Sequence, residues 1–194
     1  MSRRASRSPV VLCACLIVLA TVVRSDGRSA EKPPVPSRAP APAAQPPDCS
    51  GPEYRQFDFW AGDWEVKDAA DGSTTGTNSV TRILGGCVLQ EHWRGVKGLE
   101  GTSFNLYDRA DAAWHQTWVD SRGGRLDIAG GLRDGRMVLE GKDRKGLRGE
   151  LVRDRITWSP LPDGRVRQHW EQSHDQGVTW ATAFDGMYSR KPGS

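Results

Sequence analysis

The chain has 194 residues, of which 26% are charged and 37% hydrophobic, and a formal net charge of +3 at pH 7. Residues 1–47 contain seven Lys and Arg but only two Asp and Glu, which leaves 20 basic and 22 acidic residues for 48–194. A nucleic-acid-binding domain carries its positive charge on the folded domain itself. The composition therefore excludes a nucleic-acid partner, and the length fits one ordinary domain behind N-terminal segments.

The first 25 residues have the pattern of a signal peptide. Arg3, Arg4 and Arg7 precede the apolar run Val10–Val23, whose 14 residues are few for a membrane span and typical of a signal-peptide core. We therefore expect a signal peptide at 1–25, a secreted or periplasmic location, and no stable membrane insertion beyond this segment. An uncleaved segment that tethers the protein to the membrane is the alternative.

Residues 26–47 are rich in Pro and Ala. Such a composition does not bury enough apolar surface to offset the entropy lost on ordering. We expect a disordered linker here, followed by one domain at 48–194.

The domain contains two cysteines, Cys49 and Cys87. In an exported protein a pair of cysteines is more often oxidised than free. We expect a disulfide that joins the start of the domain to the strand near residue 87, and two unpaired thiols are the alternative.

A short helix is expected at the start of the domain. Ser50 and Glu53 have the spacing of a capping box, and Pro52 suits a first helical turn. These signals predict a helix or turn over 51–57.

Strand signals then recur about every ten residues, separated by turn pairs such as Asp71-Gly72 and Asp134-Gly135. The expected strands are 63–69, 76–84, 86–95, 101–108, 113–120, 125–131, 136–142, 149–158, 165–173 and 178–190. Short antiparallel strands joined by tight turns favour a meander whose closure removes exposed edges. The predicted fold is all-β, a single antiparallel up-and-down barrel of about ten strands with a short N-terminal helix.

The segment 173–180, SHDQGVTW, has the spacing of an Asp-box, a pattern found in sialidases. A single copy in a domain of this size does not build a propeller, which needs several four-stranded blades. We therefore interpret the segment as a turn, with Asp175 accepting hydrogen bonds from turn amides and Trp180 anchoring the turn in the core.

Alternation along three strands assigns their side chains to the two faces of the barrel, because residues two apart share a face. Each of these strands places an indole inside, with Gln or Glu two residues before it. The inward residues are Glu91, Trp93, Gln116, Trp118, Gln168 and Trp170. The neighbouring histidines His92, His115 and His169 are then expected to face solvent.

Inward amides and carboxylates are costly unless they are hydrogen-bonded. A cavity that holds water or a polar ligand relieves this cost, and barrels of this size have room for one small ligand. The alternative is a solid core in which Glu91 is paired with an inward Arg or hydroxyl. We predict that the six inward residues bind a small, partly polar or aromatic molecule, with no catalytic residue, metal ligand or cofactor.

The chain resembles an uncharacterised secreted bacterial family, domain of unknown function 1579. The segments that carry the resemblance are CSGPEYRQFDFWAGDWEV, RILGGCVLQEHW, WHQTWVD, GGLRDGRMVLEG, TWSPLPDGRVRQHWEQS and FDGMYSR. The resemblance covers nearly all of 49–190 and implies a calycin-like barrel, similar to lipocalins and fatty-acid-binding proteins. It brings no established activity.

Lipocalins share a Gly-x-Trp in the first strand, whose indole packs under an Arg of the last strand. Gly62 and Trp64 match that motif, and the resemblance makes Arg190 the candidate partner. The long first loop and the C-terminal helix of true lipocalins are missing, so their ligands are not implied.

Three further functions remain open, the first of which is a purely structural or protein-binding module presented on its tether. A small-barrel enzyme of isomerase or hydrolase type would use Glu91 as acid or base. A haem protein of the nitrobindin type, whose fold is similar, would need an inward histidine ligand.

Overall fold

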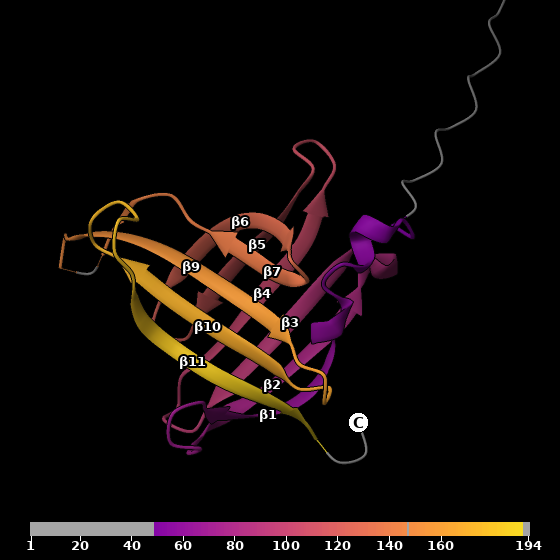
Figure 1. Ribbon diagram of the computed structural model, residues 1–194, viewed down its shortest axis with the longest axis horizontal. Coiled ribbons are helices and arrows are strands. Elements are labelled where there is room, and N and C mark those ends of the chain that lie inside the picture. The colour runs from indigo at the N-terminus through magenta and orange to yellow at the C-terminus, as the bar shows by residue number, and fades with distance from the viewer. Residues whose placement is uncertain (1–48, 147, 192–194) are drawn as a thin grey trace, which may run out of the picture. The chain divides into compact units, whose positions relative to one another are not determined.

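The strands form a closed antiparallel barrel in the computed structural model, which describes residues 49–146 and 148–191 (Figure 1). The expected signal peptide at 1–25 and linker at 26–47 lie outside the described residues. The strands are β1 (Gly62–Asp68), β2 (Thr74–Ile83), β3 (Val88–Gly95), β4 (Glu100–Asp108), β5 (Ala113–Asp120), β6 (Arg125–Arg133), β7 (Arg136–Glu140), β8 (Arg144–Lys145), β9 (Leu151–Pro160), β10 (Val166–Ser173) and β11 (Ala181–Arg190).

Ten of these strands make the ring. They follow chain order from β1 to β7, continue with β9, β10 and β11, and close where β11 pairs with β1. The short strand β8 pairs only with β9 and extends the hairpin between β7 and β9. The prediction of an up-and-down barrel of about ten strands is confirmed, and the ring leaves none of its ten strands as an exposed edge.

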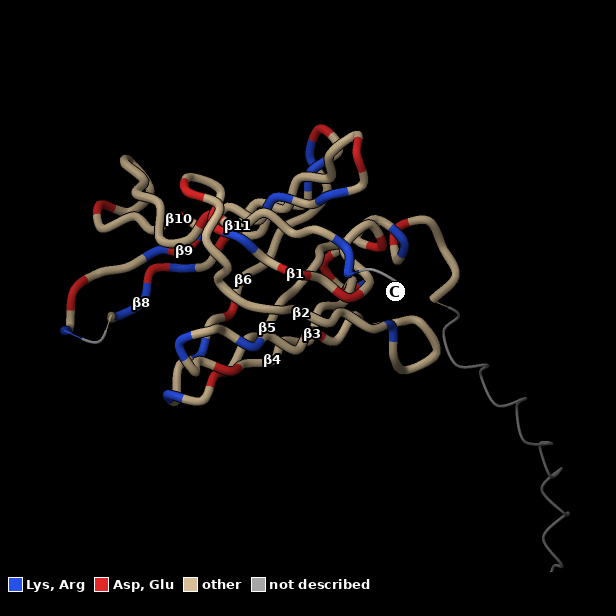
Figure 2. Tube along the Cα trace, turned by 90° about the horizontal axis from the view of Figure 1, so that it is seen from below, with Lys and Arg blue, Asp and Glu red and all other residues tan. Residues whose placement is uncertain are grey.

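Along the described part of the Cα trace, Lys and Arg positions are interspersed with Asp and Glu positions (Figure 2). Neither sign dominates the described part of the trace, in agreement with the near balance of charges read from the sequence.

The expected N-terminal helix is two 3₁₀ helices, η1 (Pro52–Arg55) and η2 (Asp58–Trp60). Tyr54, Phe57 and Trp60 are all buried. Tyr54 lies in η1, Trp60 in η2 and Phe57 at the N-cap of η2. The capping-box prediction is wrong, because Gly51 is the N-cap and no side chain caps the helix.

These aromatic residues close one end of the barrel. Phe57 stacks on Trp60 with ring centroids 5.0 Å apart and meets Trp158 at 5.1 Å and Trp114 at 5.6 Å. The Trp64 indole donates a 2.9 Å hydrogen bond to the Trp60 carbonyl. Large buried rings contribute strongly to stability, so this end is a solid apolar core, here called the aromatic plug.

Arg190 closes the seam between β1 and β11. Its guanidinium carbon lies 4.4 Å from the Trp64 ring centroid, and the two residues are paired in register. Gly62 has a φ of 138°, and a Cβ at that position would overlap the Arg190 guanidinium. This is the cation–π contact that the resemblance to lipocalins implied for these three residues.

The turn between β10 and β11 contains the Asp-box residues. Asp175 accepts hydrogen bonds from the Thr179 amide and hydroxyl, and the Thr179 contacts lower the pKa of Asp175 to about 2. The expectation that Trp180 anchors the turn in the core is wrong. Its indole lies under the Arg155 guanidinium, 3.9 Å from the ring centroid, and donates to the Gly177 carbonyl, because the seven-residue turn extends beyond the strands.

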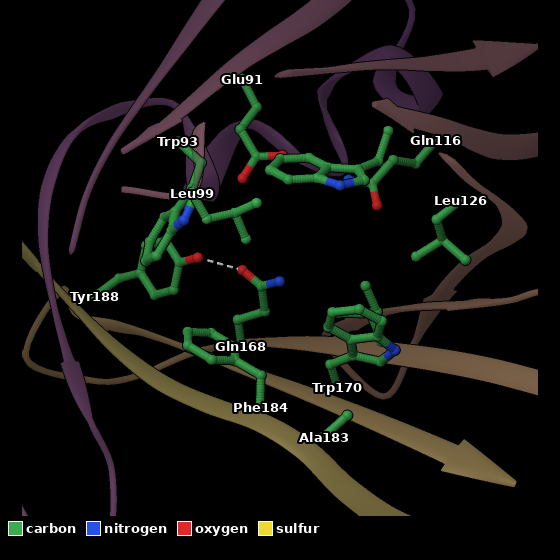
Figure 3. A pocket seen from close by; sticks show the side chains of 12 residues that line it. Glu91, Trp93, Leu99, Gln116, Leu126, Gln168, Trp170, Ala183, Phe184 and Tyr188 are labelled. Carbon is green, nitrogen blue, oxygen red and sulfur yellow. Dashed lines mark hydrogen bonds between the residues drawn. The ribbon is translucent and has the colours of Figure 1, made fainter. Parts of the chain in front are cut away.

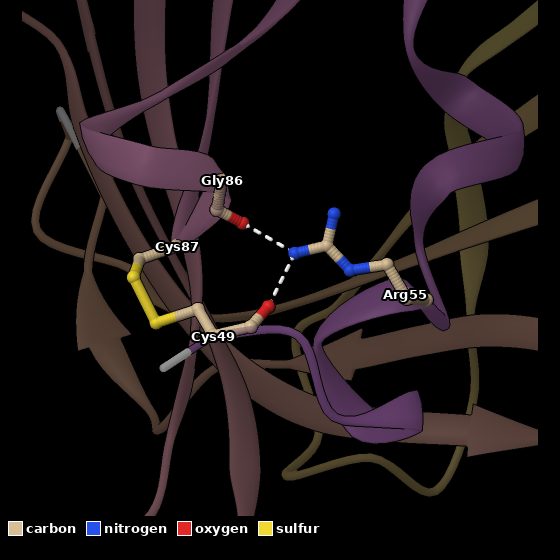
Figure 4. Close-up of a disulfide and its surroundings, with 4 residues drawn as sticks. All are labelled: Cys49, Arg55, Gly86 and Cys87. Carbon is tan, nitrogen blue, oxygen red and sulfur yellow. Dashed lines mark hydrogen bonds between the residues drawn. A yellow bond between two sulfur atoms is a disulfide. The ribbon is translucent and has the colours of Figure 1, made fainter. Parts of the chain in front are cut away.

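The predicted disulfide between Cys49 and Cys87 is present (Figure 4). One Arg55 nitrogen, Nη2, donates to the Cys49 carbonyl at 2.6 Å and to the Gly86 carbonyl at 2.7 Å. The bridge and this arginine fix the start of the domain beside the β2–β3 turn. A disulfide of this kind fits an oxidising compartment.

Replacing Cys49 and Cys87 together by Ser should lower the free energy of unfolding by about 2–4 kcal/mol, because the bridge restricts the unfolded chain over a separation of 38 residues. Denaturant unfolding measures the difference, with the reduced wild-type protein as the matching control. A double variant as stable as the oxidised protein would contradict the structural role of the bridge.

Candidate functional site

The half of the barrel away from the aromatic plug contains a cavity of about 230 Å³ (Figure 3). Its lining consists of Glu91, Trp93, Leu99, Gln116, Trp118, Leu126, Ile156, Gln168, Trp170, Ala183, Phe184 and Tyr188. All six residues that the sequence placed inside are among these twelve. The structure therefore brings them together around one space, which is somewhat smaller than the usual ligand pocket of about 300–1,000 Å³.

Strand alternation explains this convergence. In β3, Leu89 and Glu91 are buried, Trp93 lines the cavity, and His92 between them is exposed. The other two strand histidines also lie on the outer face, where His115 contacts Asp111 at 2.8 Å. The side chains of these strands therefore point inward and outward as the two-residue alternation in the sequence predicted.

Six lining residues were missed. Phe184 and Tyr188 share a face of β11, and their alternation with Gly186 was a usable signal. Ala183 lines the cavity as well because the register between β10 and β11 shifts at Trp170, leaving Ala183 as a bulge residue. A bulge re-aims side chains, and no sequence pattern marked this one.

Glycines opposite the cavity aromatics create room for their rings. A Cβ at Gly76 would lie 2.8 Å from the Trp93 ring, and a Cβ at Gly101 would overlap the Trp118 ring. These indoles therefore pack directly against the glycine backbone of the neighbouring strands.

A buried polar network surrounds the carboxylate of Glu91. The Asn78 amide donates to its Oε1 at 3.0 Å, and the Ser103 hydroxyl donates to its Oε2 at 2.6 Å. Asn105 donates to the Ser103 hydroxyl at 2.9 Å, and Gln116 donates to the Asn105 carbonyl oxygen at 2.7 Å. The solid-core alternative expected Glu91 to be paired with a hydroxyl group. That pairing is present, with Ser103, but it occurs beside an open cavity.

Burial controls the ionisation of this site. Removal from water raises the pKa of Glu91 to about 7, against the opposing effect of the hydrogen bonds from Ser103 and Asn78. Burial and the nearby charge of Glu91 raise the pKa of Tyr188 well above its ordinary value. The Tyr188 hydroxyl donates a short hydrogen bond to the Gln168 carbonyl oxygen. At neutral pH, Glu91 is therefore divided between its charged and neutral forms.

Two carboxylates on the inward faces of β9 and β5, those of Asp154 and Asp120, hold two of the cavity's indoles. The Trp170 N–H donates to Asp154 at 2.9 Å, and the Trp118 N–H lies 3.4 Å from Asp120. Asp154 is itself paired with Arg144 at 2.7 Å. Because these N–H groups are already engaged by carboxylates, the two rings present carbon surface to the cavity.

A possible metal-binding group, not found from the sequence, lies in the β4–β5 hairpin. Ligand atoms of Asp108, Asp111 and His115 lie within 4.8 Å of one another at largely exposed positions. Asp111 already pairs with His115, and Asp108 accepts the Ala110 amide at 2.8 Å. These contacts account for the arrangement without an ion.

The haem alternative lacks its ligand. Of the described residues that line the cavity, none is a histidine, whereas haem of this kind needs an inward imidazole. The geometry gives this alternative no support.

Comparison with protein-family models and with curated proteins finds no match for the chain. Among the described residues, no helix has the length and hydrophobicity needed to cross a bilayer. Membership of the family that the sequence resembles stays a prediction.

Replacing Gly101 by Ala should lower the free energy of unfolding by about 1–3 kcal/mol, because the added methyl group overlaps the Trp118 ring. Denaturant unfolding measures the loss, and near-ultraviolet circular dichroism reports the displaced indole. Gly131→Ala is the matched control, since its Cβ would meet no atom within 4 Å. Equal stability and unchanged spectra for both variants would refute the close approach.

Proposed function

We propose that the protein is an exported, non-enzymatic binding protein that holds a small, partly polar molecule inside its barrel. The observation that carries this proposal is the convergence of three indole–polar pairs on one cavity. Aromatic faces bind flat or apolar groups, and a few fixed polar atoms orient them, which is the usual composition of a ligand site.

The polar residues of the lining favour a ligand-binding role over a purely structural role in the core. Glu91 and Gln116 are almost fully buried, with exposed fractions of 4% and 3%, and both border open space rather than tightly packed atoms. A barrel selected for stability alone gains more from aliphatic residues at such positions. Keeping a carboxylate and two amides here is explained by a ligand that uses them.

The secreted or periplasmic location belongs to the same proposal. It is supported by the signal-peptide pattern of residues 1–25 and by the disulfide. The resemblance to an exported calycin-like family points the same way. The alternative is that an uncleaved signal segment tethers the exported protein to the membrane.

A small-barrel enzyme is the second candidate. Its support is Glu91, a buried carboxyl group at the cavity whose pKa of about 7 suits a general acid or base at neutral pH. The two candidates differ in the fate of the ligand, which a binding protein returns chemically unchanged.

Ligand-observed NMR with neutral, anionic and cationic fragments small enough for a 230 Å³ cavity tests the proposal. We expect binders that are recovered unchanged. Ala183→Trp should abolish their binding, because the new side chain enters the cavity from an exposed bulge position. Thr182→Trp, on the neighbouring outward position, should leave binding intact.

Absence of binders would overturn the proposal, as would binders that Ala183→Trp does not affect. Conversion of a bound fragment by the wild-type protein, lost in Glu91→Gln, would establish the enzyme instead.

A further inference from the structure

We propose that the molecule held in the cavity is a small organic monocation, an ammonium or alkylated ammonium group on a short apolar body. This inference rests on the proposed binding function and names the chemical class of its ligand. Three observations carry it: the charge of the lining, the direction of the free acceptor atoms, and the aromatic wall.

The lining has negative but no positive ionisable groups. Among the described lining residues, only Glu91 and Tyr188 titrate, and none is Lys, Arg or His. An anionic ligand would lie beside a carboxylate with no cation to balance it, at a high cost in a poorly solvated space. A cation would instead meet its counter-charge in Glu91.

Glu91 itself has no cationic partner among the described residues. Its side chain is faced by Asn78 from β2, Ser103 from β4, Gln116 from β5 and Tyr188 from β11. All four are neutral near pH 7. A buried carboxylate without a counter-charge is unfavourable, and a bound cation supplies what the protein does not.

Acceptor atoms with unused capacity point toward the cavity. A carboxylate accepts about four hydrogen bonds, and the two donors Asn78 and Ser103 occupy only part of that capacity on Glu91. Gln116 donates its amide nitrogen to Asn105, so its carbonyl oxygen is directed inward (Figure 3). An ammonium group, or the polarised methyl groups of a quaternary ammonium, would meet oxygen atoms on this side.

Much of the remaining wall is aromatic, beside the aliphatic side chains of Leu99, Leu126, Ile156 and Ala183. Its rings are those of Trp93, Trp118, Trp170 and Phe184. Aromatic faces attract cations through their quadrupoles, most strongly when the cation is desolvated. The indole N–H groups of Trp170 and Trp118 point to the carboxylates of Asp154 and Asp120, which increases the electron density of these two rings and strengthens the attraction.

Three probes of nearly the same shape but different charge test the inference. They are choline, the neutral alcohol 3,3-dimethylbutan-1-ol and the anion 3,3-dimethylbutanoate, titrated into the wild-type protein by calorimetry at pH 8. We expect choline to bind at least about tenfold more tightly than the alcohol, a ratio in line with one or two desolvated cation–π contacts. The butanoate should bind most weakly.

The charge of Glu91 should account for that preference. Glu91→Gln should lower the affinity for choline by about tenfold or more and leave the affinity for the alcohol nearly unchanged. Glu65→Gln, at an exposed position of β1, is the matched control and should behave as the wild type. In the wild type, lowering the pH from 8 to 5.5 should produce the same loss, because Glu91, with a pKa of about 7, then becomes neutral.

The pH titration needs no variant, so the inference stays testable if Glu91→Gln does not fold. The alcohol or the butanoate binding as tightly as choline would overturn the cation proposal while leaving the binding function standing. So would a choline affinity that neither acid pH nor Glu91→Gln changes. Failure of all three probes, when other fragments bind and are blocked by Ala183→Trp, would also overturn it. Absence of any fragment binding would overturn both proposals.

Discussion

The structure depends on one constraint, the alternation of side chains around a closed ring of strands, which bulges interrupt locally. Because the ring has no free edge and a period of two, every second residue must be accommodated inside. This forces Glu91, Gln116 and Gln168 into the interior together with the indoles that follow them. The polar network around Glu91 is the result, since each inward donor and acceptor needs a partner.

The barrel interior is divided into a filled end and a cavity because the space that the inward side chains occupy differs along the barrel axis. At one end Phe57, Trp60 and Trp158 fill the space completely. At the other end, Gly76 and Gly101 let two indoles pack directly against the backbone of the neighbouring strands. The same residue type, tryptophan, therefore builds a solid plug at one end and the wall of an open cavity at the other. This division leaves the cavity on which the proposed binding function rests.

Much of the fold and half of the cavity lining could be predicted from the sequence, because turn pairs and alternation are local signals. Glu91 and Trp93 were placed inside by parity alone. The contacts that depend on register or irregular backbone could not be predicted: Asn78 reaches Glu91 through the pairing of β2 with β3, and Ala183 enters the cavity through a bulge. Trp180 was misplaced because its turn extends past the end of the strands.

The central claim is that the Glu91 carboxyl group lies in a water-poor interior beside the cavity, without a cationic partner. A carboxyl-carbon NMR titration of the wild-type protein, with Glu91 assigned by its absence in Glu91→Gln, measures this directly. The account predicts a midpoint near pH 7, because burial raises the pKa of Glu91 to about 7. A midpoint near the ordinary value of 4.5 would show a solvated or charge-paired carboxylate and would contradict the account.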